Sequence, residues 1–316
     1  MIKILELFGG IGAPRKALIN LGIEHKSIDY VEFNEKAVRS YNAMFDNRYV
    51  PQNVIGYDLK PDILVHGSPC QDFSIAGKQY GGNVADGTRS SLMFETIRII
   101  ENLGIWKPRV VIWENVVNVL SKKMKNAFYH YLDDMKRLGY TNSYDVLDAR
   151  DFGIPQARKR LFTISTLDNK HFNFFSLENK QMRPIREFLE VDADERYIIK
   201  APSMLRYIPG SKTYIEPSQT KFKGRLMVIE EYCMTITTAQ DRNPNSGIVK
   251  LVDDRYRVLT ERECWRLMGF EDEDFENALN EHPGIQGKMN ATLYHQAGNS
   301  MVVDVLEAIF KRLVAQ

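Results

Sequence analysis

The chain has 316 residues, of which 44% are hydrophobic and 26% are charged, and its formal net charge is +1. This composition is typical of a soluble globular protein, and the near-neutral charge does not by itself indicate a polyanionic partner. Only three cysteines occur, widely spaced, which argues against a disulfide framework or a CxxC metal site. With no signal peptide and no membrane-length apolar stretch, we expect a cytoplasmic protein.

The first half of the chain alternates short apolar strands with helical patterns. Strands are predicted at 2–8, 27–32, 62–66, 109–113, 143–147 and 161–165, and helices at 14–21, 35–45, 91–103 and 123–138. Such alternation predicts an α/β fold with a parallel sheet and right-handed crossovers. Ligands of such a sheet lie beyond the carboxyl ends of its strands.

After about residue 168 the helical periodicity fades, and five prolines interrupt the chain before residue 259. This predicts a second, loop-rich domain with short strands. Helical patterns return at 260–268 and at 300–313. The first of these begins with a predicted capping box, in which Thr260 is the N-cap and Glu263 stands three residues later.

A glycine-rich turn joins the first strand to the first helix and consists of Phe8, Gly9, Gly10, Ile11 and Gly12. Such a turn serves a dinucleotide, a nucleoside such as S-adenosylmethionine, or no ligand at all. The spacing GxGxxG is absent, which disfavours a pyrophosphate. Glu32 ends the second strand about 20 residues further on, where a carboxylate can accept hydrogen bonds from ribose hydroxyls. The glycine turn and Glu32 together favour an adenosine ligand. The alternative is that Glu32 is an ordinary surface glutamate.

Cys70 follows an apolar strand through a turn of Gly67, Ser68 and Pro69, and it is the candidate nucleophile. A lone cysteine is more often a small buried hydrophobe, so other residues have to decide its role. Glu114 and Asn115 end the most apolar strand, where a carboxylate near a cysteine from the neighbouring strand would form a reaction centre of two groups. Two arginines, Arg158 and Arg160, precede a further strand, on which alternate residues share a face.

At these segments the chain resembles the C5-cytosine-specific DNA methyltransferases of the small prokaryotic or phage type. The matching residues follow the family's order along almost the whole chain: 8–12, 32, 67–74, 114–116, 156–160, 262–264 with 266–270, 296 and 298–300. The resemblance implies a Rossmann-like, S-adenosylmethionine-dependent methyltransferase sheet. It also implies a catalytic and cofactor-binding domain of residues 1–170 plus 291–316, and a smaller target-recognition domain with a hinge at 171–290.

The resemblance implies methyl transfer to carbon 5 of a cytosine flipped out of a specific short duplex sequence. Cys70 would bond covalently to carbon 6, and Glu114 would hydrogen-bond ring N3 and the exocyclic amine, with Asn115 in the same motif. Arg158 would hold the pyrimidine O2, with Arg160 beside it. A mobile loop at 71–88 would close over the base.

The resemblance also assigns binding residues. For S-adenosylmethionine it implies the glycine turn, Glu32, an adenine stacked on Phe33, and a set that completes the pocket: Asp58, Leu59, Pro69, Leu92, Asn299, Ser300 and Met301. Asp62 competes with Asp58 for the adenine amine. For DNA it implies Gln71, Ser74, Gln156, Thr235 and Ile236, although the register of the last pair is ambiguous.

Two other functions fit the same segments. One is a tRNA cytosine-5 methyltransferase, and the other is a non-catalytic DNA-binding or regulatory protein on the same scaffold. The resemblance further suggests a monomer with no appended regulatory domain, near the nucleoid when bound to duplex DNA, and in some cells paired with a cognate restriction endonuclease. Glu263 is expected to be structural, and Cys233 and Cys264 are expected to be buried thiols.

Overall fold

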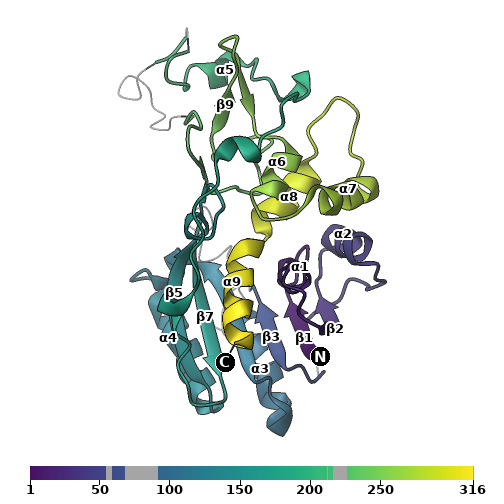
Figure 1. Ribbon diagram of the computed structural model, residues 1–316, viewed down its shortest axis with the longest axis vertical. Helices are drawn as coiled ribbons and strands as arrows, with labels where there is room; N and C mark the ends of the chain where they lie inside the picture. The colour runs from purple at the N-terminus through teal and green to yellow at the C-terminus, as the bar shows by residue number, and fades with distance from the viewer. Residues whose placement is uncertain (55–58, 68–91, 212, 216–225, 316) are drawn as a thin grey trace.

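The computed structural model describes residues 1–54, 59–67, 92–211, 213–215 and 226–315 (Figure 1). Its centre is a six-stranded sheet in the order β2-β1-β3-β4-β7-β5. The strands are β1 (Ile2–Leu7), β2 (His25–Val31), β3 (Ile63–His66), β4 (Val110–Val116), β5 (Thr141–Asp148) and β7 (Lys159–Thr166). The first four are mutually parallel, as the alternation of strands and helices predicts.

The expectation of a wholly parallel sheet is wrong at β7, which runs antiparallel to both β4 and β5. Between β5 and β7 the chain forms only the short turn η5 (Ala149–Asp151) and the two-residue strand β6 (Gln156–Ala157). A parallel crossover needs a dozen or more residues, usually with a helix, whereas an antiparallel pair accepts a short connection. The start of β7 therefore lies beside the carboxyl end of β4, where Arg160 is opposite Val116.

Both faces of the sheet are covered. Successive residues of β1, Ile4 and Leu5, belong to different hydrophobic clusters, and so do Leu64 and Val65 of β3. One face packs against α1 (Ala13–Asn20) and α9 (Val303–Val314), and the other against α3 (Leu92–Asn102) and α4 (Lys125–Arg137). Burial on both faces explains why these strands are apolar runs without polar alternation. The connecting 3-10 turns here are η3 (Gly104–Trp106) and η4 (Val117–Leu120).

The described residues between 171 and 290 form mostly turns and short elements, at the top of Figure 1. β9 (Ile248–Lys250) and β10 (Tyr256–Val258) form an antiparallel pair with a small hydrophobic cluster of its own, and β8 (Cys233–Met234) pairs with β6. A larger cluster runs without interruption from the sheet to Trp265 and Phe275. The domain boundaries therefore stay a prediction. The other elements of this region are η6 (Phe174–Ser176), η7 (Ile185–Glu187), η8 (Glu195–Tyr197), α5 (Pro202–Leu205), α6 (Glu261–Arg266) and α7 (Asp272–Glu281), and α8 (Ala291–Asn299) comes next along the chain. Helix α2 (Glu35–Phe45), from the first part of the chain, packs on α7.

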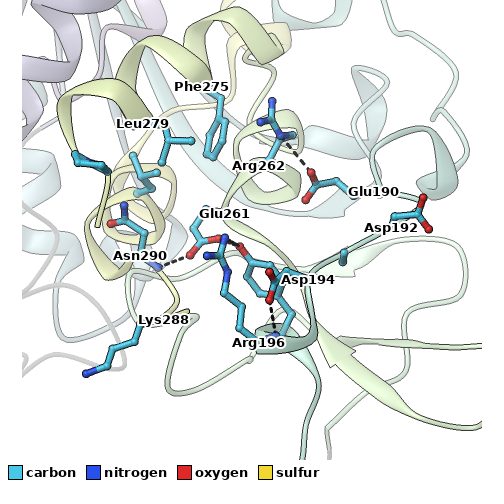
Figure 2. A pocket seen from close by; sticks show the side chains of 14 residues that line it. Glu190, Asp192, Asp194, Arg196, Glu261, Arg262, Phe275, Leu279, Lys288 and Asn290 are labelled. Atoms are coloured by element: carbon cyan, nitrogen blue, oxygen red, sulfur yellow. Dashed lines mark hydrogen bonds and ion pairs between the residues drawn. The ribbon is translucent and has the colours of Figure 1, made fainter. Parts of the chain in front are cut away.

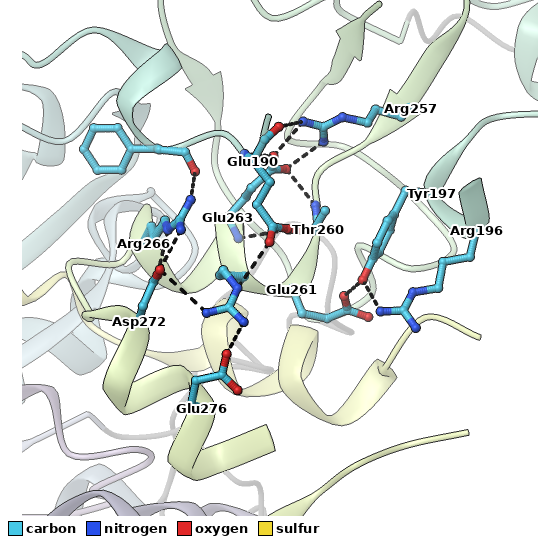
Figure 3. Close-up of polar contacts among 12 residues, drawn as sticks. Glu190, Arg196, Tyr197, Arg257, Thr260, Glu261, Glu263, Arg266, Asp272 and Glu276 are labelled. Atoms are coloured by element: carbon cyan, nitrogen blue, oxygen red, sulfur yellow. Dashed lines mark hydrogen bonds and ion pairs between the residues drawn. The ribbon is translucent and has the colours of Figure 1, made fainter. Parts of the chain in front are cut away.

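The predicted capping box of α6 is present, and Glu263 has further partners (Figure 3). Its buried carboxylate accepts hydrogen bonds from Arg257 Nη2 at 2.6 Å and Nη1 at 2.8 Å, and from the backbone N–H of Glu190 at 2.7 Å. Glu263 is thus structural, as expected. Cys233 and Cys264 are buried, and burial raises the pKa of both thiols, so neither is an accessible thiolate.

Within the described residues, no helix combines the length and apolar character that crossing a membrane requires.

Candidate active site

One edge of the sheet collects most of the predicted site residues that the structure describes. The carboxyl ends of β2, β1, β3 and β4 and the start of β7 follow one another along it. Glu32, the glycine turn, Gly67, Glu114 and Arg160 therefore lie in this order, one strand apart, with neighbouring strands roughly 5 Å from each other.

The glycine turn has a conformation that its glycines make possible. Gly10 has φ 55° and Gly12 has φ 78°, both in the left-handed region. A Cβ added to Gly9 would lie 2.5 Å from ring atoms of Tyr30, so the turn also needs the missing side chain. The hydroxyl of Tyr30 donates to the carbonyl of Gly10 at 2.5 Å, and this hydrogen bond stabilises the turn.

Glu32 is joined to this turn. Its Oε2 accepts from the N–H of Gly10 at 3.1 Å, and its Oε1 accepts from the N–H of Asn34 at 2.8 Å. A carboxylate has about four lone-pair sites, so two hydrogen bonds leave capacity for ligand hydroxyls. The next side chain, Phe33, is 79% exposed and offers a ring for stacking.

A buried glutamate that the sequence motifs do not single out supports the turn. Glu6 of β1 is fully buried, and Tyr41 of α2 donates to its Oε1 at 2.7 Å. Burial raises the pKa of Glu6 to about 7, although Tyr41 and Arg15 act in the opposite direction. The rings of Tyr41 and Tyr30 stack with centroids 3.8 Å apart. The available signal is a glutamate between two leucines in the strand Ile2–Leu7.

The candidate nucleophile Cys70 lies outside the described residues, as do Asp58, Pro69, Gln71, Ser74 and the loop 71–88. The strand that leads to it is described. β3 ends at His66, which pairs with Trp113, so Gly67 follows beside Glu114. His66 is buried with Nε2 3.0 Å from the hydroxyl of Tyr131, and burial lowers its pKa to about 3, which keeps the ring neutral.

Glu114 and Arg160 form an ion pair across β4 and β7. Nε of Arg160 lies 3.0 Å from Oε1 of Glu114, and the two side chains are only 17% and 13% exposed. Burial raises the pKa of Glu114, and the charges of Arg160 and Arg158 oppose this rise without cancelling it. A carboxyl with a raised pKa can carry a proton and donate it in a hydrogen bond. Asn115 is buried, and its Oδ1 accepts from the N–H of Val116 at 2.8 Å.

Arg158 is bound within the chain, and its expected contact with the pyrimidine stays a prediction. Arg158 lies between β6 and β7, so Arg158 and Arg160 are not alternate residues of one strand. Its guanidinium is buried and donates to three backbone carbonyls, those of Ile236, Gly298 and Ser300. Arg160 therefore forms the ion pair with Glu114, and the guanidinium of Arg158 binds backbone carbonyls of the chain.

Two of the expected DNA contacts also lie in the interior. Gln156 is 0% exposed, and its Nε2 donates to the carbonyl of Leu267 at 2.8 Å. Its Oε1 accepts from the N–H of Ile236, whose side chain is 1% exposed. Both side chains are therefore buried in this structure, and their contact with DNA stays a prediction. Thr235 is half-buried, and its hydroxyl donates to the carbonyl of Ala157 at 2.8 Å.

The residues expected to complete the cofactor pocket are only partly described. Ser300 donates through Oγ to the carbonyl of Met301 at 3.0 Å, and Asn299 ends α8. A Cβ added to Gly67 would lie 3.0 Å from Cε of Met301, which brings this loop to the end of β3. Leu59 is 40% exposed, and Leu92 begins α3.

The described residues form one cavity at these strand ends and another away from them. An open groove of about 390 Å³ borders the end of β4 and is lined by Val117, Asp148, Arg150, Ala157, Lys159 and Thr235. A second cavity of about 210 Å³ lies between the segment 190–197 and helices α6, α7 and α8 (Figure 2). Several of its charged side chains are paired with one another, as Glu190 is with Arg262. Its lining contains none of the residues predicted for the reaction or the cofactor.

A family model described as C-5 cytosine-specific DNA methylase matches residues 2–315. The chain belongs to this family. It is a DNA (cytosine-5-)-methyltransferase. The type II methyltransferase M2.ScrFI of Lactococcus lactis subsp. cremoris is 32% identical over 99% of both chains. The type II methyltransferase M.NgoBI of Neisseria gonorrhoeae is 32% identical over 98% of this chain and 92% of its own.

Solved structures agree on the fold. The S. pombe Dnmt2 methyltransferase superposes with a TM-score of 0.77 at 20% identity, covering 100% of this chain and 99% of its own. A putative DNA modification methyltransferase encoded within an E. coli prophage gives a TM-score of 0.71 at 16% identity, covering 100% and 99%. The expected Rossmann-like methyltransferase fold is confirmed.

Proposed function

We propose that the protein transfers a methyl group from S-adenosylmethionine to carbon 5 of a flipped cytosine in a specific short duplex sequence, through a covalent bond between Cys70 and carbon 6. The observation that carries this proposal is the buried pair of Glu114 and Arg160, one strand away from the strand end that leads to Cys70. We propose that the protein binds duplex DNA as its partner. We expect it to act as a monomer, whether or not a restriction endonuclease is present in the same cell.

The described residues at the ends of β1 and β2 suit an adenosine-type ligand. The left-handed turn at Gly10 and Gly12 lets a ligand approach the backbone closely. Glu32 retains acceptor capacity, and Phe33 offers an exposed ring. Bound there, S-adenosylmethionine would supply an electrophilic methyl group. We propose that Asn299, Ser300 and Met301 close this pocket together with Asp58, Leu59, Pro69 and Leu92.

Carbon 5 of cytosine is too weak a nucleophile to be methylated directly. Addition of the Cys70 thiolate to carbon 6 pushes ring electrons toward N3 and makes carbon 5 nucleophilic. A protonated Glu114 would donate to N3 and stabilise that charge, which its raised pKa permits. Arg160 would hold Glu114 in place and reach the pyrimidine O2. After methylation, a base removes the proton from carbon 5, the bond from sulfur to carbon 6 breaks, and the thiolate leaves.

The decisive test is a covalent trap. Duplex DNA with 5-fluorocytosine at the target position has no proton to lose from carbon 5, so the adduct to Cys70 should accumulate and survive denaturation. The target position is first found by sequencing methylated cytosines in DNA from cells that express the protein. Cys70→Ser should abolish the adduct, whereas Cys233→Ser, a change at a buried thiol, should keep it. An adduct that persists in Cys70→Ser would rule out this nucleophile.

The nucleic acid is tested separately with labelled S-adenosylmethionine. Methyl transfer to duplex DNA is the expected result. Transfer to tRNA alone would favour the tRNA alternative, and failure to transfer to either would favour a non-catalytic DNA-binding or regulatory protein.

A further inference from the structure

Arg158 joins three segments that are far apart in the sequence. From its place between β6 and β7, its Nη1 donates to the carbonyl of Ile236 at 3.0 Å. Its Nη2 donates to the carbonyl of Gly298 at 3.0 Å and to that of Ser300 at 2.7 Å. The planar guanidinium has five donors in a fixed geometry, so one side chain can hold two backbone segments at once.

Further contacts make this joint close. A Cβ added to Gly298 would lie 2.5 Å from backbone atoms of Thr237 and Thr238, so the end of α8 touches this backbone directly. On the other side of Arg158, Gln156 accepts from the N–H of Ile236 at 3.0 Å. The segment 235–238 is thereby fixed from two directions, by the arginine motif and by α8.

The contacts of this joint extend to the end of β3, the strand that leads to Cys70. Ser300 is followed by Met301, whose Cε lies against the Cα side of Gly67. Gly67 is the first residue after β3, three positions before Cys70. A continuous series of contacts therefore leads from residues 235–238 through Arg158 to the segment 298–301 and to Gly67.

We infer that Arg158 is a positioning residue that couples the segment 235–238, in the predicted recognition region, to the segment 298–301 at the end of α8, which closes the proposed cofactor pocket. DNA held by the recognition region would then stabilise the closed segment, and by reciprocity the bound cofactor would strengthen DNA binding. The second half of this inference rests on the proposed function. The joint itself rests on the hydrogen bonds of Arg158 and the contact of Gly298.

Arg158→Lys is the informative variant because it keeps the positive charge and loses the planar group that reaches three carbonyls. Arg257→Lys is the matched control. Arg257 is also 3% exposed and also bonds several groups, but these are Val258, Glu190 and Glu263, outside the joint. Both variants should lose stability, so an effect confined to Arg158→Lys would not be an effect of destabilisation alone.

The joint is tested by hydrogen exchange on the full chain without DNA or cofactor. Arg158→Lys should speed amide exchange in 235–238 and in 298–301 together, and Arg257→Lys should leave 298–301 as in the wild type. Gly298→Ala, which forces the backbones apart, should reproduce the pattern of Arg158→Lys. Faster exchange in only one of the two segments, or in neither, would overturn the inference.

The coupling is tested by titrating S-adenosylhomocysteine into the protein with and without the target duplex. The wild type should bind it about fivefold or more tightly when DNA is present, a ratio typical of coupled sites. In Arg158→Lys the ratio should fall toward one, and in Arg257→Lys it should be kept. An unchanged ratio in Arg158→Lys, or a ratio of one in the wild type, contradicts the coupling. If the wild type does not bind S-adenosylhomocysteine at all, the proposed cofactor is wrong, and hydrogen exchange alone decides on the joint.

Discussion

Arg160 and Glu114 contact each other across neighbouring antiparallel strands, with Nε 3.0 Å from Oε1. This contact exists because β7 runs antiparallel to β4, which brings the start of one strand to the end of the other. A protonated Glu114 is the form that can donate to a ring nitrogen, whereas the arginine favours the ionised form. The effect of burial is larger than the effect of the arginine charge, so the pKa of Glu114 is raised overall, and a change in that charge would change it.

Arg160→Gln should change both the rate and its pH dependence. Loss of one charged donor at the reacting group should lower kcat roughly 100-fold. Removal of the opposing charge should raise the pKa of Glu114 further. Because the proposed mechanism needs a protonated Glu114, the decline of kcat/KM with rising pH should move to higher pH.

The measurement is kcat/KM for methyl transfer to the target duplex from pH 5 to 9. Arg150→Gln is the control, because Arg150 lies at the same edge but pairs with Asp148. It should leave the position of the decline unchanged. A decline at the wild-type pH in Arg160→Gln would show that Glu114 does not control it.

Glu6 should make the stability of the protein depend on pH. Burial raises the pKa of Glu6 from 4.5 to about 7. Between these values the folded protein holds a proton that the unfolded chain releases, so the free energy of unfolding falls as pH rises through this window. The contribution is on the order of 3 kcal/mol and is fully present below pH 4.5.

Glu6→Gln removes this titration, so the difference in unfolding free energy between pH 5 and pH 8 should shrink in urea denaturation. Glu24→Gln, a change at an exposed glutamate just before β2, should keep the wild-type difference. Equal pH dependence in Glu6→Gln and the wild type would contradict the assignment.

The sequence predicts the first half of the fold well, because strands such as Ile63–His66 are apolar runs and Glu35–Phe45 is amphipathic. It does not predict the direction of β7, since direction depends on how the chain returns after β5. Nor does it separate Arg158 from Arg160. Only one residue separates the two arginines in the sequence. Arg158 is the one that binds backbone carbonyls, and those carbonyls belong to the distant segments 236 and 298–300.

Gln156 shows the same limit. Polar residues are mostly exposed, so a glutamine in a DNA-enzyme motif suggests contact with DNA. Its burial depends on backbone groups of Leu267 and Ile236, more than 70 residues away, which satisfy its amide. Local patterns do not report such partners.

The pair of Arg257 and Glu263 should contribute strongly to stability. Both side chains are almost fully buried, at 3% and 0% exposure. Glu263→Ala would leave a buried arginine charge without its carboxylate, which typically costs about 3–5 kcal/mol. Urea unfolding measures the loss. Arg255 and Glu195 form a matched exposed pair nearby, and Glu195→Ala should change stability far less. Similar losses in both variants would contradict the importance of burial.

Lys159 should contribute to the affinity for DNA without selecting its sequence. Its exposed side chain lines the groove beside Val117 and, among the described residues, forms no ion pair. At this edge of the sheet it can neutralise one phosphate, and each neutralised phosphate adds roughly 0.9 to the slope of log affinity against log salt concentration. Lys159→Gln should therefore reduce that slope by about 0.9, equally for target and unrelated duplexes, because phosphate contacts carry no base information. The control is Lys136→Gln, an exposed lysine in the last turn of α4, at the opposite edge of the sheet. If both variants gave the same slope in titrations at several salt concentrations, the groove would not be part of the DNA-binding surface.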